Sequence, residues 1–483
     1  MAYPPTTGAA GAAAASASSG RRRAAWREGA ERARAAATTE PGRLHVIGAV
    51  LAALVVAFGA VTAWQVSDRQ TAADAVVEHS QPLSADAASI YRSLADADTT
   101  AASAFLAGGQ EPTEVRRRYE ADIDRASKLL VRAAANTDGS ATAREEIRRI
   151  NELLPVYTGL VESARANNRQ GLPLGGAYLR YANDTMRQRL LPAAGRLYQA
   201  ETARLGADYE EATSWPWAAI GIGVAALAAL GWAQRRDFLR TNRVFNRGLL
   251  ASAAASAVAL VWLAVGHGLA RSALNDSNDH GAKSLHVLNE ARIDSLRARG
   301  DENLTLVARG AVVVDKEGKD KDKDAYEVGY AEQMSGLIGD DGTDAGSIAG
   351  GDKARAAPGS LLARARDLAD DDEGRAPVDE AITHVREWQV RHKAARAADD
   401  AGNYKDARAK VIGGEGSTST GESFDKVDEL LAKALAHEQR EFKRAADDGR
   451  GALTGLALGA GVLAALGAAA ALLGIGRRLS EYR

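Results

Sequence analysis

Four long apolar segments constrain the fold of this chain more than any other feature. They lie at 44–66, 215–233, 248–270 and 451–475, and none of them contains Asp, Glu, Lys or Arg. Each is long enough to cross a hydrocarbon core about 30 Å thick, which takes about 20 helical residues. The pattern therefore predicts four transmembrane helices, with two long polar loops between them.

The charges that flank these segments predict which side of the membrane each part occupies. The N-terminal tail 1–43, expected to be disordered, the link 234–247 and the end 476–483 are all basic and share one side. Lys and Arg near the ends of spans favour the cytoplasmic side. The same positive strips suit anionic lipid headgroups, so we expect membrane lipids as partners and no nucleic acid. We predict a multi-pass cell-membrane protein with both termini in the cytoplasm.

The two long loops carry the opposite charge. Residues 67–214 include 18 basic and 21 acidic side chains, and residues 272–449 include 26 and 37, so both are net negative. We expect both loops to be extracytoplasmic. The sequence has no cysteine, which excludes disulfides and thiolate metal sites, so stability there must come from packing.

The first loop, 67–214, has the composition and punctuation of a helical bundle. Ala, Leu, Arg and Glu dominate, and Gly, Pro and Asn mark the breaks between helices. Helices of this length joined by short turns favour an antiparallel four-helix bundle. The expected helices are 67–107, 112–135, 141–169 and 175–213.

The second loop, 271–450, follows the same plan less regularly. A charged segment at 315–324 and a Gly- and Asp-rich stretch at 339–359 interrupt it, and its last helix is expected to continue directly into the fourth span. The predicted fold is thus all-α, with four transmembrane helices and two extracytoplasmic helical-bundle domains. The helices expected in this loop are 272–310, 360–370, 376–400, 403–412 and 421–449.

Three patterns resemble chemical sites but lack the partners that the chemistry needs. Asp320-x-Asp322-x-Asp324 starts like a calcium loop, but Ala325 and Ala331 stand where Gly and Glu are required.

Ser423-x-x-Lys426 matches a serine acyl-enzyme motif by spacing alone, and we expect Ser423 to cap a helix. His384 and His392 lack the i, i+4 spacing of a zinc helix and are expected to be surface histidines. We therefore predict no catalytic residue, no metal site and no cofactor, and a protein that is not an enzyme.

The segment 157–180 concentrates amide, guanidinium and phenol groups at a helix–turn–helix. Arg binds carboxylates through two parallel hydrogen bonds, and Asn both donates and accepts. Such groups suit an amino-acid-like ligand or the polar surface of a partner. The alternative is that they cap and lock the turn. The candidate residues are Tyr157, Glu162, Arg165, Asn167, Asn168, Arg169, Tyr178 and Arg180.

Two stretches of this chain resemble a known family. The sequence YTGLVESARANNRQGLPLGGAYLR at 157–180 and the sequence RARGDENLTL at 297–306 are similar to segments of the GlnX family, four-span membrane proteins of high-GC bacteria. The resemblance adds Arg297, Asp301 and Glu302 to the candidate binding residues. It implies an extracytoplasmic solute-binding lipoprotein, GlnH-like, that recognises aspartate- or glutamate-like ligands. It also implies a cytoplasmic serine/threonine kinase, protein kinase G-like, as the recipient. The span–bundle–span layout is similar to that of bacterial chemoreceptors.

These observations predict a non-enzymatic transmembrane signal relay from the lipoprotein to the kinase. The expected cytoplasmic contacts are Arg235, Arg236, Arg240 and Arg243. Two alternatives stay open: a direct small-ligand sensor of the chemoreceptor type, and an envelope scaffold that does not switch. The sequence also leaves homo-oligomer formation open.

Overall fold

The computed structural model describes residues 40–108, 111–137, 140–241, 246–314, 322–339, 355–413 and 418–480. Regular structure in these ranges is helical, apart from an isolated bridge between Val313 and Asp324. The chain forms two compact units. We call the first, Met1–Gln70 with Ser214–Leu269 and Ala452–Arg483, the span unit. The second, Thr71–Thr213 with Ala270–Gly451, is the bundle unit.

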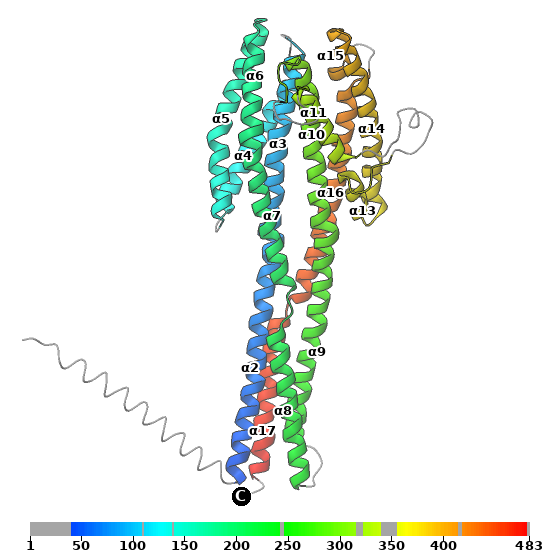
Figure 1. Ribbon diagram of the computed structural model, residues 1–483. Helices are drawn as coiled ribbons and strands as arrows, with labels where there is room; N and C mark the ends of the chain where they lie inside the picture. The colour runs from blue at the N-terminus through cyan, green and yellow to red at the C-terminus, as the bar shows by residue number, and fades with distance from the viewer. Residues whose placement is uncertain are drawn as a thin grey trace, which may run out of the picture. The chain divides into compact units, whose positions relative to one another are not determined.

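The span unit contains the four apolar segments, and each is helical as predicted. Within the described residues, four helices are long and apolar enough to cross a membrane. Small residues permit close approach of these helices, as expected in lipid. A Cβ on Gly248 would lie 2.4 Å from the carbonyl oxygen of Ala470, so only glycine fits there. The helices are α2 (Glu40–Ala75), α8 (Trp217–Thr241), α9 (Arg247–Asp276) and α17 (Leu456–Ser480) (Figure 1).

Two of these helices continue beyond the apolar segment without a break. Helix α2 passes through a π-helical turn, η1 (Val76–Ser80), into α3 (Gln81–Leu106). Helix α9 passes through η3 (Ser277–Ala282) into α10 (Lys283–Ala308). We call these two continuous helices rod one and rod two. π turns are rare in helices, and those that occur are often found at functional sites.

The other two helices are interrupted. Helix α7 (Leu191–Thr213) ends before Pro216, and α8 begins at Trp217. Helix α16 (Thr420–Leu453) ends at a turn containing Gly455, whose φ is +82°, before α17 begins. Helix α16 therefore enters the fourth apolar segment directly, as predicted, but the turn at residues 454–455 inside that segment was not predicted. Gly455 takes up a left-handed conformation that ends a helix, because it has no Cβ.

The first polar loop forms the predicted helices. Helix α3 packs on α4 (Thr113–Asn136) and α7, and α5 (Ala141–Arg169) packs on α6 (Leu174–Thr185) and α7 (Figure 1). A second difference from the prediction is η2 (Met186–Leu190), a π turn that joins α6 to α7.

The second polar loop adds helices that match the expected ranges within a few residues. Helix α11 was not predicted; the side chain of Asp324 caps it by accepting from the backbone N–H groups of Tyr326 and Glu327. Asp320, the first residue of the rejected calcium pattern, lies outside the described residues. The helices after α10 are α11 (Ala325–Leu337), α13 (Leu361–Leu368), α14 (Asp372–Asp400), α15 (Tyr404–Ile412) and α16.

One hydrophobic core joins the two polar loops within the bundle unit. Helix α3 of the first loop packs directly on α10 of the second. Ile90 and Leu94 from α3 belong to the same buried cluster as Leu288, Trp388 and Val427. The two loops, which are separate in the sequence, therefore bury their apolar faces together, and a change in one loop is felt by the packing of the other.

Candidate functional site

The segment 157–180 lies at the end of α5 and the start of α6. Tyr157 is completely buried, and its hydroxyl donates to Oδ1 of Asp98 over 3.3 Å. Arg165 is also buried; it donates to Glu162 over 2.6 Å and pairs with Glu111 over 2.9 Å. Its guanidinium stacks on the ring of Tyr119. The contacts of Arg165 link α5 to α4 and to Glu111, which precedes α4 in the chain.

Two asparagines hold the turn between α5 and α6. Asn168 donates from Nδ2 to the carbonyl oxygen of Phe105 over 3.1 Å, and Asn167 donates to that of Ser163 over 2.8 Å. Gly171 completes the turn with φ of +68°. Of the remaining predicted residues, Arg169 is exposed, whereas Tyr178 and Arg180 are half-buried. The Asn168 bond therefore fastens the end of α5 to the end of α3, in keeping with the alternative that these residues lock the turn, whereas the Asn167 bond stays within α5.

Arg297, Asp301 and Glu302 all lie on α10. The guanidinium of Arg297 bonds to and stacks on Tyr91 of α3. Asp301 is 1% exposed and pairs with Arg187 of η2. Burial raises the pKa of Asp301 to about 6, against the opposing effect of the Arg187 charge. These side chains connect rod two to the first loop through the interior of the bundle unit.

Asp98 occupies the centre of this interior contact. It is buried, and its Oδ2 accepts from Nδ2 of Asn183 over 2.7 Å while Oδ1 accepts from Tyr157. Burial raises the pKa of Asp98, although the charge of Arg187 acts in the opposite direction. The next residue, Thr99, donates to the carbonyl oxygen of Leu296 over 3.0 Å, so polar bonds join the two rods directly.

Glu302 is the centre of a second buried network, which sequence reasoning missed except for Glu302 itself. Its carboxylate accepts from Trp388 Nε1 over 3.2 Å, from Thr420 Oγ1 over 2.9 Å and from His392 Nδ1 over 2.9 Å. Arg299 pairs with the same carboxylate. The network joins rod two to α14 and α16, so a charge is buried here but fully paired.

His392 was predicted to be a surface histidine, and that prediction was wrong. It is 3% exposed, its Nε2 lies 3.1 Å from Glu327 Oε1, and Tyr330 stacks on its ring with centroids 3.7 Å apart. Burial by itself lowers the pKa of His392, but its hydrogen bonds to Glu302 and Glu327 raise it to about 9. The imidazole is therefore a buried cation, and only the tertiary fold brings its carboxylate partners together.

The predicted helix cap at Ser423 was also wrong. Ser423 lies inside α16, where its hydroxyl accepts from Arg391 over 2.7 Å. Ser419 holds the cap position instead and accepts from the backbone N–H of Glu422.

A cavity of about 530 Å³ lies between the two rods inside the bundle unit. Gln81, the residue that follows η1, contributes to its lining, as do Asn278 and Ala282 of η3. Apolar side chains make up much of the wall. Polar pairs at the wall are Gln81 with Gln439 (3.0 Å), Ser84 with Thr202 (3.1 Å) and Tyr198 with His286 (2.7 Å).

The charged groups at this cavity are mainly basic. Lys283 and Arg364 line it, together with the carboxylate of Asp367, and the imidazole of His286 adds a polar group. A largely apolar pocket with a few convergent polar groups is the usual form of a small-molecule site. The residues come from five different helices, so no local motif in the sequence indicates the cavity.

Residues 72–210 match the family described as Actinobacterial sensor domain. The matched segment runs from rod one to the end of α7 and contains the candidate residues 157–180, the Asp98 contact and one wall of the cavity. No curated protein and no solved structure matches the chain. The match indicates a sensing or signalling role, and together with the four apolar helices it fits a multi-pass membrane protein.

The predicted cytoplasmic contacts lie at the end of α8. Arg235 and Arg236 are in the last turns of this helix, and the guanidinium of Arg236 lies over the ring of Trp232. Arg240 belongs to the same helix, whereas Arg243 lies outside the described residues. The described arginines thus form a basic end to an apolar helix.

Proposed function

We propose that this protein is a transmembrane signal relay whose bundle unit senses a ligand and whose two rods carry the signal. One observation carries the proposal: residues in or next to both π turns line the cavity between the rods. Each rod is one continuous helix that includes an apolar segment long enough to span a membrane. A molecule in the cavity would therefore contact the point of each rod where the helical register is already irregular.

The mechanism that we propose is a population shift between two helix arrangements. A π turn holds one extra residue, and moving or removing it rotates the helix on one side relative to the other. The occupied and the empty cavity favour different registers of η1 or η3, and the rods transmit the difference as a small rotation or slide. The ligand must bind the two arrangements with different affinity, because otherwise it shifts nothing.

We further propose the partners that the family resemblance implies. A solute-binding lipoprotein loaded with an aspartate- or glutamate-like ligand would dock on the bundle unit, on the predicted extracytoplasmic side. A serine/threonine kinase would read the cytoplasmic surface that includes Arg235 and Arg236. The basic end of α8 supports a partner with an acidic surface.

Crosslinking in native membranes followed by co-purification tests these partners. A lipoprotein and a kinase should be recovered with the wild-type chain, and the kinase should be lost from a variant carrying Arg235→Glu and Arg236→Glu. Recovery of neither protein sinks this version of the relay. If the protein is instead an envelope scaffold, partners should still be recovered, but the phosphorylation of cytoplasmic targets should not change with the external amino acid.

The cavity favours a second candidate function, in which the bundle unit binds a small molecule directly. Lys283 and Arg364 at the wall suit a carboxylate, and the apolar wall suits the remainder of the molecule. Calorimetry on the full chain in lipid nanodiscs, with aspartate, glutamate and asparagine in turn, tests this function. Gly206 lines the cavity and has open space where a Cβ would stand, so Gly206→Leu should narrow the cavity and weaken binding.

Gly159 supplies the matched control for that experiment. It is also an exposed helical glycine with open space around its missing Cβ, but it lies on α5 and does not line the cavity. Gly159→Leu should leave the affinity unchanged. Binding that survives Gly206→Leu at full strength would place the ligand elsewhere, and the absence of heat with any ligand would favour docking of a partner protein.

A further inference from the structure

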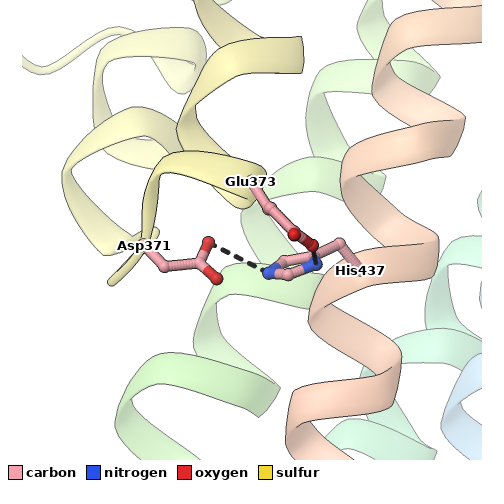
Figure 2. A group of neighbouring side chains, drawn as sticks. All are labelled: Asp371, Glu373 and His437. Atoms are coloured by element: carbon pink, nitrogen blue, oxygen red, sulfur yellow. Dashed lines mark ion pairs between the residues drawn. The ribbon is translucent and has the colours of Figure 1, made fainter.

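His437 and four carboxylates gather where α14 begins beside α16. Figure 2 shows His437 with two of them, Asp371 and Glu373. His437 and Glu441 are four residues apart on α16 and therefore lie on one face of that helix. Asp371 is the N-cap of α14 and accepts from the backbone N–H of Gly374. The five residues of this cluster are Asp370, Asp371, Glu373, His437 and Glu441.

The imidazole of His437 is aimed into the cluster without completing a hydrogen bond. The residue is 6% exposed, and its buried Nε2 has no hydrogen-bond partner. Two carboxylate oxygens nevertheless lie close to Nε2: Asp371 Oδ1 at 3.0 Å and Glu441 Oε2 at 3.4 Å. Nε2 thus lies within ion-pair distance of both carboxylates but without the geometry of a hydrogen bond to either, so it is positioned for a third group that all of them share.

These separations are those of ligands around one metal ion. In a tetrahedral site with bonds of 2.0–2.2 Å, neighbouring ligand atoms are about 3.4 Å apart. The carboxylate oxygens of Asp370, Asp371 and Glu441 also lie within 4.8 Å of one another, so Asp370 adds a further carboxylate beside Asp371 and Glu441.

The second nitrogen of His437 has the partner that a metal-bound histidine needs. Nδ1 lies 3.5 Å from Oε2 of Glu373, on the opposite side of the ring from Asp371 (Figure 2). Metal-binding histidines almost always direct their other N–H to a carboxylate or carbonyl, which fixes the ring orientation.

We propose that Asp371, His437 and Glu441 bind a divalent transition-metal ion, for which Zn²⁺ and Mn²⁺ are the probes. One imidazole with several carboxylates suits these ions, whereas Ca²⁺ and Mg²⁺ prefer an all-oxygen set. Glu373 acts as a positioning residue through Nδ1 of His437. The bound ion would fasten the start of α14 to α16. The sequence predicted no metal site, because α14, α15 and the first part of α16 separate Asp371 from Glu441, and only α16 has a metal-like spacing.

The test is calorimetry on the full chain in nanodiscs, stripped with chelator and titrated separately with Zn²⁺, Mn²⁺ and Ca²⁺. We expect one Zn²⁺ or Mn²⁺ per chain and weak or no binding of Ca²⁺. His437→Gln should weaken binding by at least about 100-fold, and Glu373→Gln by about 10-fold. Asp371→Asn keeps the helix cap but removes the ligand charge, so it should also weaken binding while the fold is retained.

His384 provides the matched control. It pairs with Glu387 over 3.0 Å and lies 4.0 Å from Glu380, but all three are on α14 and no second element supplies a ligand. His384→Gln should bind the ion like the wild type. Replacement of the ion by Co²⁺ should give visible absorption bands that disappear in His437→Gln. Absence of binding, binding of Ca²⁺ alone, or equal affinity in wild type and His437→Gln would each overturn the proposal.

Discussion

Nδ1 of His392 lies 2.9 Å from Oε1 of Glu302, and both side chains are almost completely buried. The pair joins rod two to α14 in the interior of the bundle unit. Its partners on the other sides are Arg299, Glu327 and Tyr330. A buried ion pair of this kind is costly to break, since each partner left alone is an uncompensated charge in a poor solvent. The bundle unit should therefore respond strongly to changes at these two positions.

The first prediction concerns pH and His392. The pKa of His392 in the folded protein is raised to about 9, whereas an exposed histidine has a pKa near 6.5. The charged imidazole thus stabilises the fold fully below about pH 6.5, and this contribution is lost as the pH rises through about 9. The difference corresponds to about 3 kcal/mol.

Denaturant unfolding of the full chain at pH 6 and at pH 10 checks this prediction. The wild type should lose stability between these values, and His392→Gln should show a smaller dependence on pH. Burial raises the pKa of Tyr330 as well, so its ionisation in the unfolded chain also lowers stability near pH 10, but this loss is common to both proteins and cancels in the comparison. Equal pH dependence in both proteins would mean that His392 is not a buried cation.

The second prediction concerns the charge of Glu302. Glu302→Gln keeps the shape of the side chain but leaves Arg299 and His392 without their common carboxylate. We expect a loss of about 3–5 kcal/mol in the free energy of unfolding. Glu152→Gln is the control, because its pair with Arg148 is exposed on both sides and should change stability by less than about 1 kcal/mol. Similar losses for the two variants would show that burial does not determine how much an ion pair contributes to the free energy of unfolding.

The apolar spans and most helices could be predicted from the sequence, since both depend on local pattern. Long apolar runs predict membrane helices by length, and Gly and Pro mark the ends of the others. The π turns could not be predicted, because a single extra residue in a helix leaves no local signature. The end of α16 at Gly455 was missed for a related reason: glycine is common in these spans, and the sequence alone does not distinguish a packing glycine from a turn.

The roles of the candidate site residues, unlike the helices, could not be predicted from the sequence. Tyr157, Asn168 and Glu302 were selected for their polar chemistry, and the structure places all three in interior or turn-locking contacts. The partners that decide these roles, such as Asp98 and His392, are about 59 and 90 residues away in the chain. The cavity and the His437 cluster also join distant helices, so only the tertiary fold brings their residues together.

The third prediction separates ligand binding from turn locking in the segment 157–180. Asn168→Ala removes the hydrogen bond to the carbonyl oxygen of Phe105 and should cost about 1–2 kcal/mol of unfolding free energy. Arg169→Ala changes an exposed neighbour and should stay within about 0.5 kcal/mol. Thermal unfolding of both variants measures this difference. A ligand-binding role for Asn168 without a turn-locking role would instead leave stability unchanged and alter only partner or ligand affinity.

The fourth prediction concerns the turn between α16 and α17. Gly455 has a φ of +82°, and alanine in this left-handed region costs about 1–2 kcal/mol. Gly455→Ala should therefore lower the free energy of unfolding in detergent micelles, or drive residues 454–455 towards a helical path. Gly451→Ala is the control: Gly451 is exposed within α16, nothing lies near its missing Cβ, and alanine there should stabilise the helix by up to about 1 kcal/mol. If the two variants shift stability in the same direction, the interruption before α17 does not depend on the conformational freedom of Gly455.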